Sequence, residues 1–187
     1  MTSNIAVLIM AAGAATRFGS PKQLAQYQGQ TLLQRCIDSA NAVFSNKVSV
    51  VLGAHADQIE PQILGAQVII NPDWQNGLGG SIACGARHID PTAHGVFILL
   101  ADQIHIVPEQ LQVMAQAFEG DNIVAAHYCG VRGVPAIFPR SYFQQLQGLT
   151  EDSGAKTLLS NTELSVTEIA LPEAELDIDR PEDLNKL

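Results

Sequence analysis

The segment "AAGAATRFGSPKQL" (residues 11–24) gathers two glycines and two cations directly after an apolar run. A glycine such as Gly13 lets backbone N–H groups approach an anion closely. Arg17 offers paired, planar donors that match a phosphate group, and Lys22 offers a compact positive charge. We therefore predict that this loop binds phosphate. The alternative is an ordinary turn-rich loop that carries two surface cations.

The spacing of this loop differs from that of two well-known phosphate-binding motifs. The P-loop requires G-x-x-x-x-G-K-[ST], but here Ser20 and Pro21 separate Gly19 from Lys22. The dinucleotide-binding fingerprint requires G-x-G-x-x-G, but Gly13 is followed by two alanines. The residues therefore indicate an anion site of another kind.

A carboxylate closes a second apolar run, "GVFILLAD" (residues 95–102). At the end of a buried strand, an unpaired carboxylate is costly unless a cation or hydrogen-bond donors meet it. Mg²⁺ is a suitable cation, because it prefers one or two carboxylates together with substrate phosphates. We predict that Asp102 is a Mg²⁺ ligand, with a capping or turn aspartate as the alternative.

Two more acids lie near the C-terminus, in "LDIDRPEDL" (residues 176–184). If the chain is extended there, Asp177 and Asp179 point to the same face. Pro181 and the acids after it are typical of the first turn of a helix. The two aspartates could therefore serve in a site or simply in helix capping.

A third glycine-rich stretch, "NGLGGS" (residues 76–81), follows another apolar run. Gly79 permits close approach of a ligand, and Ser81 stands where we expect a helix to begin. Free N–H groups at that helix start could meet a base or a phosphate. The alternative is a plain glycine turn with Ser81 as the helix cap. For Trp74, just before this stretch, we expect a packing role.

The elements that must position these residues alternate along the chain. Helical spacing of apolar residues occurs around residues 32–40 and again around 111–118, where Pro108 suits a first helical turn. Continuous apolar runs predict strands at Ile5–Met10, Val48–Leu52, Val68–Ile70, Val96–Leu100 and Ile123–Ala126. Strands that alternate with helices indicate an α/β fold with a mostly parallel sheet, covered by helices on both faces.

The pattern loosens in "YCGVRGVPAIFPRSYF" (residues 128–143). We expect an insertion or an antiparallel excursion at the edge of the sheet there, with a turn at Gly133–Pro135 before a short strand. Further on, Gly154 and the two residues before it are expected to cap a helix over residues 155–159.

Composition narrows the class of protein. The chain has 187 residues, of which 47% are hydrophobic and 16% charged, which is typical of a globular protein. We expect residues 1–187 to form a single domain. The formal net charge of −9 opposes binding to nucleic acid. The apolar runs are too short to cross a membrane.

The cysteines and the N-terminus bear on location. Cys36, Cys84 and Cys129 are widely spaced and odd in number, so neither a disulfide framework nor a zinc site is indicated. We expect all three to be small buried side chains. A secretion signal carries a positive charge before its apolar run, but the first cation here is Arg17, which follows the run. Together these features favour the cytoplasm.

The motifs together resemble a known family. The loop "MAAGAATRFGSPKQL" is similar to the signature loop of nucleotidyltransferases, and most similar to that of the molybdenum cofactor cytidylyltransferases. Guanylyltransferases of this group carry A-G-G where this chain has Ala11, Ala12 and Gly13. The resemblance extends over nearly the whole chain and implies a Rossmann-like three-layer nucleotidyltransferase fold with a mostly parallel mixed sheet.

The resemblance also implies an activity, which is transfer of CMP from CTP to the molybdopterin-type molybdenum cofactor with release of pyrophosphate. Its implied cofactor is Mg²⁺, held by Asp102 and Asp179, with Asp177 as the competitor of Asp179. Lys22, Arg17 and Asp102 would be catalytic. The implied nucleotide-binding residues are Ala11, Ala12, Gly13, Arg17, Lys22, Gly79 and Ser81.

Departures from the family pattern concern mainly the acceptor side. Glu151 and Lys156 replace a glycine and an arginine that lie near the pterin, and Ala101 and Ile104 flank Asp102 where the family has Gly and Pro. A molybdoenzyme or its maturation chaperone is an expected protein partner. Two rival functions stay open: transfer of another nucleotide or to another phosphorylated acceptor, and a non-catalytic module that binds and delivers the cofactor.

Overall fold

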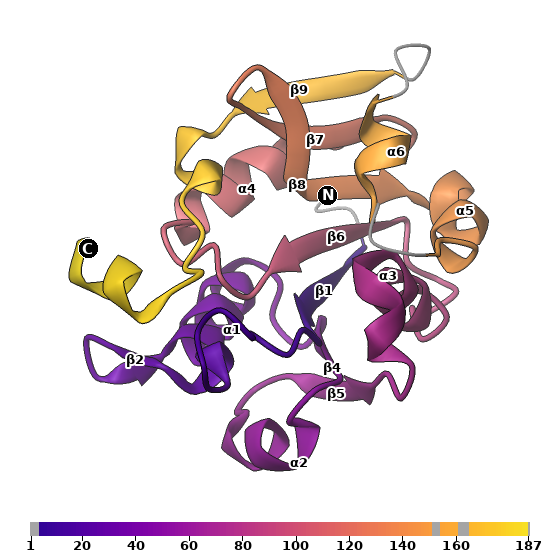
Figure 1. Ribbon diagram of the computed structural model, residues 1–187. Coiled ribbons are helices and arrows are strands. Elements are labelled where there is room, and N and C mark those ends of the chain that lie inside the picture. The colour runs from indigo at the N-terminus through magenta and orange to yellow at the C-terminus, as the bar shows by residue number, and fades with distance from the viewer. Residues whose placement is uncertain (1–3, 151–153, 161–164, 187) are drawn as a thin grey trace.

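The computed structural model describes residues 4–150, 154–160 and 165–186, and within these ranges seven strands form one mixed sheet (Figure 1). The strands lie in the order β5-β4-β1-β6-β8-β7-β9. Their bounds are β1 Ile5–Ala11, β4 Val48–Leu52, β5 Gln67–Ile70, β6 Gly95–Leu100, β7 Ile123–Tyr128, β8 Val131–Pro139 and β9 Val166–Ala170. A small separate ribbon pairs β2 (Gln26–Tyr27) with β3 (Gln30–Thr31).

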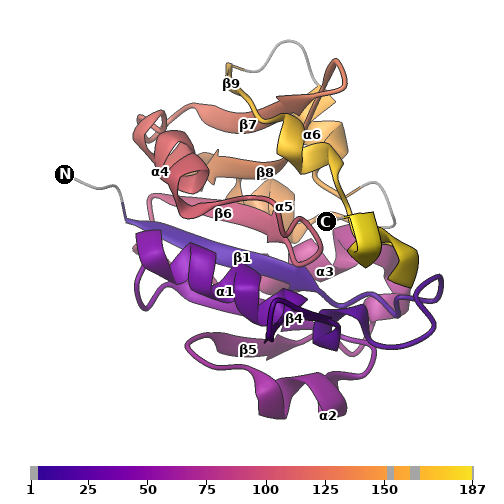
Figure 2. The ribbon, with the colours of Figure 1, turned by 90° about the vertical axis from the view of Figure 1, so that its left-hand side faces the viewer.

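Helices cover both faces of the sheet, as Figure 2 shows. One apolar cluster packs α1 (Leu32–Val43) and α4 (Pro108–Gln116) against one face, with Ile59 from α2 (Ala56–Ile59). A second cluster packs α3 (Gly77–Ala86), α5 (Phe143–Gln147) and α6 (Lys156–Ser160) against the other. The central strands are buried on both faces, which explains their continuously apolar sequences. The expected three-layer α/β fold is thus confirmed.

The topology places a crevice beside β1. From β1 the chain moves through α1 to β4 and then β5, and it returns to β6 on the opposite side of β1. All these neighbouring pairs are parallel. In such sheets ligands bind at the carboxyl ends of the strands, where the order reverses. The loops that follow β1 and β6 both begin at this edge of the sheet.

All five predicted strands are present, but the later part of the chain differs from our expectation. The strand β8 is antiparallel, as expected, yet it lies inside the sheet between β6 and β7 and not at an edge. The predicted turn at Gly133–Pro135 is wrong, because these residues belong to β8. Ala125 pairs with Ala136 while Ala126 pairs with Gly133, so the two residues between form a bulge.

Local signals account for where the helices begin. The Thr31 hydroxyl accepts a hydrogen bond from the Gln34 amide (3.1 Å) and caps α1. Pro108 occupies the first turn of α4. The prediction that a helix begins at Ser81 is wrong: α3 begins at Gly77, preceded by the short 3₁₀ turn η3 (Trp74–Asn76). The helix predicted after Gly154 is confirmed as α6, while residues 151–153 lie outside the described residues.

The cysteines and the C-terminal segment match the sequence-based expectations only in part. The three cysteines are free thiols, as expected, but Cys36 and Cys84 are only partly buried and Cys129 is exposed. Pro181 does begin a helix, the 3₁₀ segment η6 (Pro181–Lys186). In the part of the chain that the structure describes, no helix combines the length and apolar character needed to cross a membrane.

We expect Gly95→Ala to lower the free energy of unfolding by about 1–3 kcal/mol, because it would overpack the core. A Cβ on Gly95 would lie 2.7 Å from the Phe118 ring and 3.0 Å from the Phe138 carbonyl oxygen. Gly148→Ala is the matched control, since its nearest neighbours would lie at 3.6 Å. Urea unfolding of both variants checks this, and equal stabilities would contradict it.

Candidate active site

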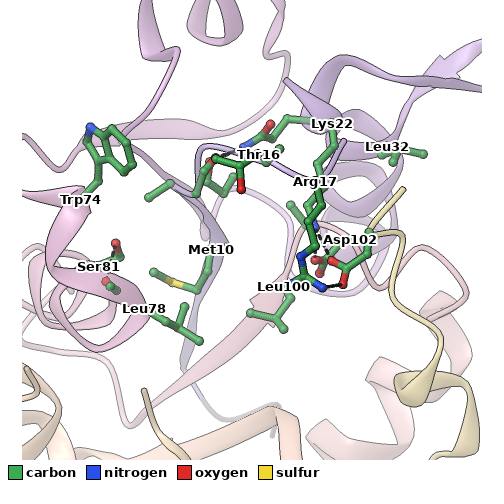
Figure 3. Close-up of a pocket in the computed structure, with 18 of the residues that line it drawn as sticks. Met10, Thr16, Arg17, Lys22, Leu32, Trp74, Leu78, Ser81, Leu100 and Asp102 are labelled. Carbon is green, nitrogen blue, oxygen red and sulfur yellow. Dashed lines mark hydrogen bonds and ion pairs between the residues drawn. The ribbon is translucent and has the colours of Figure 1, made fainter. Parts of the chain in front are cut away.

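A cavity of about 450 Å³ opens at the carboxyl ends of β1 and β6 (Figure 3). Of the residues that the sequence singled out, all but one of the proposed nucleotide and metal ligands line it: Ala11, Ala12, Gly13, Arg17, Lys22, Ser81, Asp102 and Asp179. Gly79 does not line the cavity, because it is buried inside α3. The fold therefore brings together loops that are far apart in the sequence.

Gln23 shapes the loop after β1. Its side-chain amide is buried and donates hydrogen bonds to the carbonyl oxygens of Ala11 (2.8 Å) and Gly13 (3.0 Å). The Ala12 carbonyl oxygen accepts from the Ala54 amide (3.0 Å). Three successive carbonyl oxygens, which would repel a phosphate, are thus engaged by the protein itself. This role of Gln23 is not predicted from the sequence, where its only signal is a polar residue beside Lys22.

Charged side chains form a network at one end of the cavity. The Lys22 ammonium lies 2.6 Å from Asp102 Oδ2 and 3.6 Å from Asp179 Oδ1, and it donates to the Ile178 carbonyl oxygen (3.1 Å). Arg17 Nη1 lies 2.6 Å from Asp179 Oδ2. The Lys22–Asp102 pair is largely shielded, with side chains 19% and 18% exposed, whereas Arg17 is 69% exposed.

The C-terminal segment reaches this network through contacts with the loop after β6. The Ile178 amide donates to the Asp102 carbonyl oxygen (3.4 Å). The buried Gln103 side chain donates to the carbonyl oxygens of Ala174 (2.8 Å) and Val134 (3.0 Å). Gln103 therefore holds β8 and the C-terminal segment beside Asp102. It is a second positioning residue that the sequence pattern did not reveal.

The carboxylates fit a divalent cation that is shared with a ligand. Asp102 Oδ1 is buried and has no hydrogen-bond partner among the described residues, so an acceptor is left over at the cavity. Within the same ranges, no group of three or more His, Cys, Asp or Glu side chains is arranged to hold a metal ion alone. A cation bound here would take its remaining ligands from phosphates or water, as Mg²⁺ commonly does.

Asp177 differs from Asp179 in its surroundings. It does not line the cavity, and the structure pairs Asp179 with both cations. Partial desolvation of its carboxyl group, with the nearby Asp102 carboxylate as the next cause, raises the pKa of Asp177, while Lys22 lowers it. Asp177 is exposed overall, so water screens this effect. Asp179 therefore remains our prediction for the second metal ligand.

Ser81 and its neighbours form the opposite wall of the cavity. The Ser81 hydroxyl donates to the Gly77 carbonyl oxygen (3.3 Å) and accepts from the buried Asn71 side chain (3.1 Å). While the hydroxyl donates to Gly77, it has only a lone pair to offer a ligand. Of the two residues that the resemblance places near the pterin, Lys156 is exposed at the start of α6 and does not line the cavity, and Glu151 lies outside the described residues.

Comparison with known proteins identifies the family. Residues 7–166 match the family described as the MobA-like NTP transferase domain, which is most of the chain. The chain therefore belongs to the MobA-like NTP transferase family. This confirms the nucleotidyltransferase resemblance at the level of the family.

Similar curated proteins differ in name and in how much of their length this chain covers. The bifunctional protein GlmU of Sorangium cellulosum (strain So ce56) is 32% identical over 133 residues, which cover 65% of this chain and 28% of GlmU. The chain thus spans less than a third of the length of that relative. The purine catabolism protein PucB of Bacillus subtilis (strain 168) is 26% identical and aligns over 94% of this chain and 92% of its own length.

Solved structures confirm the nucleotidyltransferase fold. Rv0371c from Mycobacterium tuberculosis H37Rv superposes with a TM-score of 0.87 and 26% identity, over 100% of this chain and 97% of that one. A manganese complex of the same protein gives a TM-score of 0.83, over 99% and 98% of the two chains. A nucleotidyl transferase from Methanothermobacter thermautotroptrophicus shares the fold at 18% identity, with a TM-score of 0.83 over 97% and 94%.

We expect Gln23→Glu to lower the free energy of unfolding by at least about 2 kcal/mol. The change places a carboxylate against the Ala11 and Gly13 carbonyl oxygens, which would lose their donor. The matched control is Gln145→Glu on α5, an exposed position that gains the same charge. Urea denaturation measures both variants, and an equal loss in the two would show that Gln23 does not hold the loop.

Proposed function

We propose that this chain transfers CMP from CTP to the molybdopterin-type molybdenum cofactor and releases pyrophosphate. One observation carries the proposal: Arg17, Lys22, Asp102 and Asp179 meet at one end of a cavity large enough for a nucleotide. Cations suited to phosphates stand beside carboxylates suited to a divalent metal. A site for nucleotide binding alone would need the cations but not the carboxylates.

In the proposed reaction, a phosphate oxygen of the acceptor attacks the α-phosphorus of CTP. A new P–O bond forms, the bond between the α-phosphorus and the bridging oxygen breaks, and pyrophosphate leaves. The attacking phosphate is already anionic, so no general base is required. The protein contributes position and charge stabilisation.

Lys22 and Arg17 have to change partners for this to occur. In the structure both cations are paired with these carboxylates: Arg17 with Asp179, and Lys22 with Asp102 and Asp179. Lys22 would leave Asp102 to neutralise charge on the transferring phosphoryl group, and Arg17 with the Gly13 loop would receive the pyrophosphate. The released Asp102 and Asp179 would hold Mg²⁺, which supplies Lewis-acid stabilisation of the phosphate oxygens. The manganese complex of Rv0371c supports a divalent cation in this fold.

The choice of CTP rests on Ala12 and Ser81. Ala12 carries a Cβ where the guanylyltransferase branch has glycine, which would crowd a purine more than a pyrimidine. While it donates to the Gly77 carbonyl oxygen, the Ser81 hydroxyl can accept from the amino group of cytosine, which uracil lacks. Gly79 would act indirectly, as part of the helix that carries Ser81.

The wider setting belongs to the same proposal. Residues 1–187 would act as a single domain, in the cytoplasm, where the three free thiols remain reduced. The molybdenum cofactor would pass to a molybdoenzyme or its maturation chaperone. With a formal net charge of −9, neither nucleic acid nor a membrane surface is a proposed partner.

Pyrophosphate release tests the proposal directly. Wild-type protein with Mg²⁺ is assayed with each of the four triphosphates, and with molybdenum cofactor, a sugar phosphate or an alcohol phosphate as acceptor. We expect CTP with the molybdenum cofactor to be used at least about 10-fold better than GTP. Equal use of GTP would contradict the base assignment, and preference for another acceptor would contradict the substrate. Nucleotide binding without turnover would indicate a delivery module.

We expect Asp102→Asn to lower turnover at least about 100-fold while the fold stays intact, because the change keeps shape and removes charge. Asp179→Asn should lower turnover similarly. In the double variant the loss should be much smaller than the two single losses combined, because both residues would serve one ion. Asp57→Asn, an exposed carboxylate on α2, is the control. Magnesium titration of each variant measures the effect. Normal turnover and magnesium demand in Asp102→Asn would contradict the metal site.

A further inference from the structure

The cavity has two chemically different ends. Arg17, Lys22 and Asp102 gather on one side in Figure 3, while Trp74 and Leu78 lie on the other, with Met10 between them. A nucleoside triphosphate is likewise polyanionic at one end and flat and weakly polar at the other. If its phosphates lie against the cations, its base is directed toward Trp74.

Trp74 packs closely against Gly53, a residue that does not line the cavity. A Cβ on Gly53 would lie 2.7 Å from Trp74 Cγ and 2.8 Å from the Ala12 carbonyl oxygen. Glycine at this position therefore lets Trp74 lie directly against the end of β4. Any larger residue would displace either the tryptophan or the loop after β1.

The backbone around Trp74 is also fixed. The buried Asn71 accepts from the Asp73 amide (3.1 Å) with its side-chain oxygen and donates to Ser81 with its side-chain nitrogen (3.1 Å). The Asn71 amide donates to the Leu52 carbonyl oxygen (2.8 Å). The segment between β5 and α3 is thus attached both to β4 and to α3, and the indole is presented to the cavity by a rigid support.

We propose that Trp74 is the surface on which the base of the bound nucleotide stacks. This rests on the proposed function, since it assumes a nucleotide in this cavity. Stacking of bases on aromatic side chains tolerates any base, because every base has a π-face. Trp74 therefore raises affinity for nucleoside triphosphates in general, and selection between bases is left to Ala12 and Ser81. The sequence alone predicts only a packing role for this residue.

Trp74 is the only tryptophan in the chain, so its fluorescence reports on its own surroundings. Wild-type protein with Mg²⁺ is titrated with CTP, with GTP and with inorganic tripolyphosphate, and calorimetry measures binding independently. We expect CTP and GTP to change the emission and tripolyphosphate to bind with little change. Emission that does not respond to either nucleotide would overturn the proposal.

Substitution separates stacking from packing. Trp74→Ala should weaken CTP and GTP binding alike, by about 10- to 100-fold, and leave the Kd of tripolyphosphate within about 2-fold. Trp74→Phe should retain most of the affinity, while Trp74→Leu, which keeps apolar bulk without an aromatic face, should lose it. Val113→Ala on α4, an apolar side chain that is 50% exposed, is the control. A parallel loss of tripolyphosphate binding would show that Trp74 only supports the loop.

The same variants distinguish this proposal from the proposed function. If pyrophosphate is released, Trp74→Ala should raise KM for CTP with kcat little changed, because stacking is equal in the ground and transition states. Turnover with an unchanged KM would overturn the stacking role and leave the activity standing. Nucleotide binding that is weakened by Trp74→Ala, without turnover on any acceptor, would support the stacking role and contradict the proposed transferase activity.

Discussion

The ion pair between Lys22 and Asp102 is the interaction on which the site depends. It joins the loop after β1 to the loop after β6, and Asp179 extends it to the C-terminal segment. Both side chains are largely shielded from water, so either charge would be costly without the other. A ligand that draws Lys22 away must leave Asp102 with another cation. Under the proposed function, the triphosphate would replace Asp102 beside Lys22 and the divalent metal would replace Lys22 beside Asp102, so we expect their binding to be coupled.

The parallel part of the sheet explains why such distant residues meet. Because β1 and β6 run side by side in the same direction, the segments that follow them emerge at the same edge. Buried polar groups then adjust the loops: Gln23 holds the carbonyl oxygens after β1, Gln103 holds the C-terminal segment, and Asn71 holds the wall around Trp74. The apolar core thus determines which loops meet at the cavity, and the three side-chain amides determine the conformation of those loops.

Much of this arrangement could be predicted from sequence patterns. Continuous apolar runs identified five strands, because strands buried on both faces have no polar side. The strand β8 was harder to place, since its bulge interrupts the pattern at Val134 and Pro135 and its position between β6 and β7 depends on pairing with both. The start of α3 was misplaced at Ser81, because glycine disfavours helix formation and three of the four residues from Gly77 to Gly80 are glycines.

The sequence by itself determined the chemistry that is available: two cations in one glycine-rich loop and carboxylates after an apolar run, in a chain of the NTP transferase family. Those properties follow from residue type and local spacing. Only the tertiary structure decided which groups face each other, that Asp179 and not Asp177 meets both cations, that Gly79 is withdrawn into a helix, and that Trp74 lies across from Lys22. These outcomes depend on packing between segments far apart in the chain, and no local pattern records such contacts.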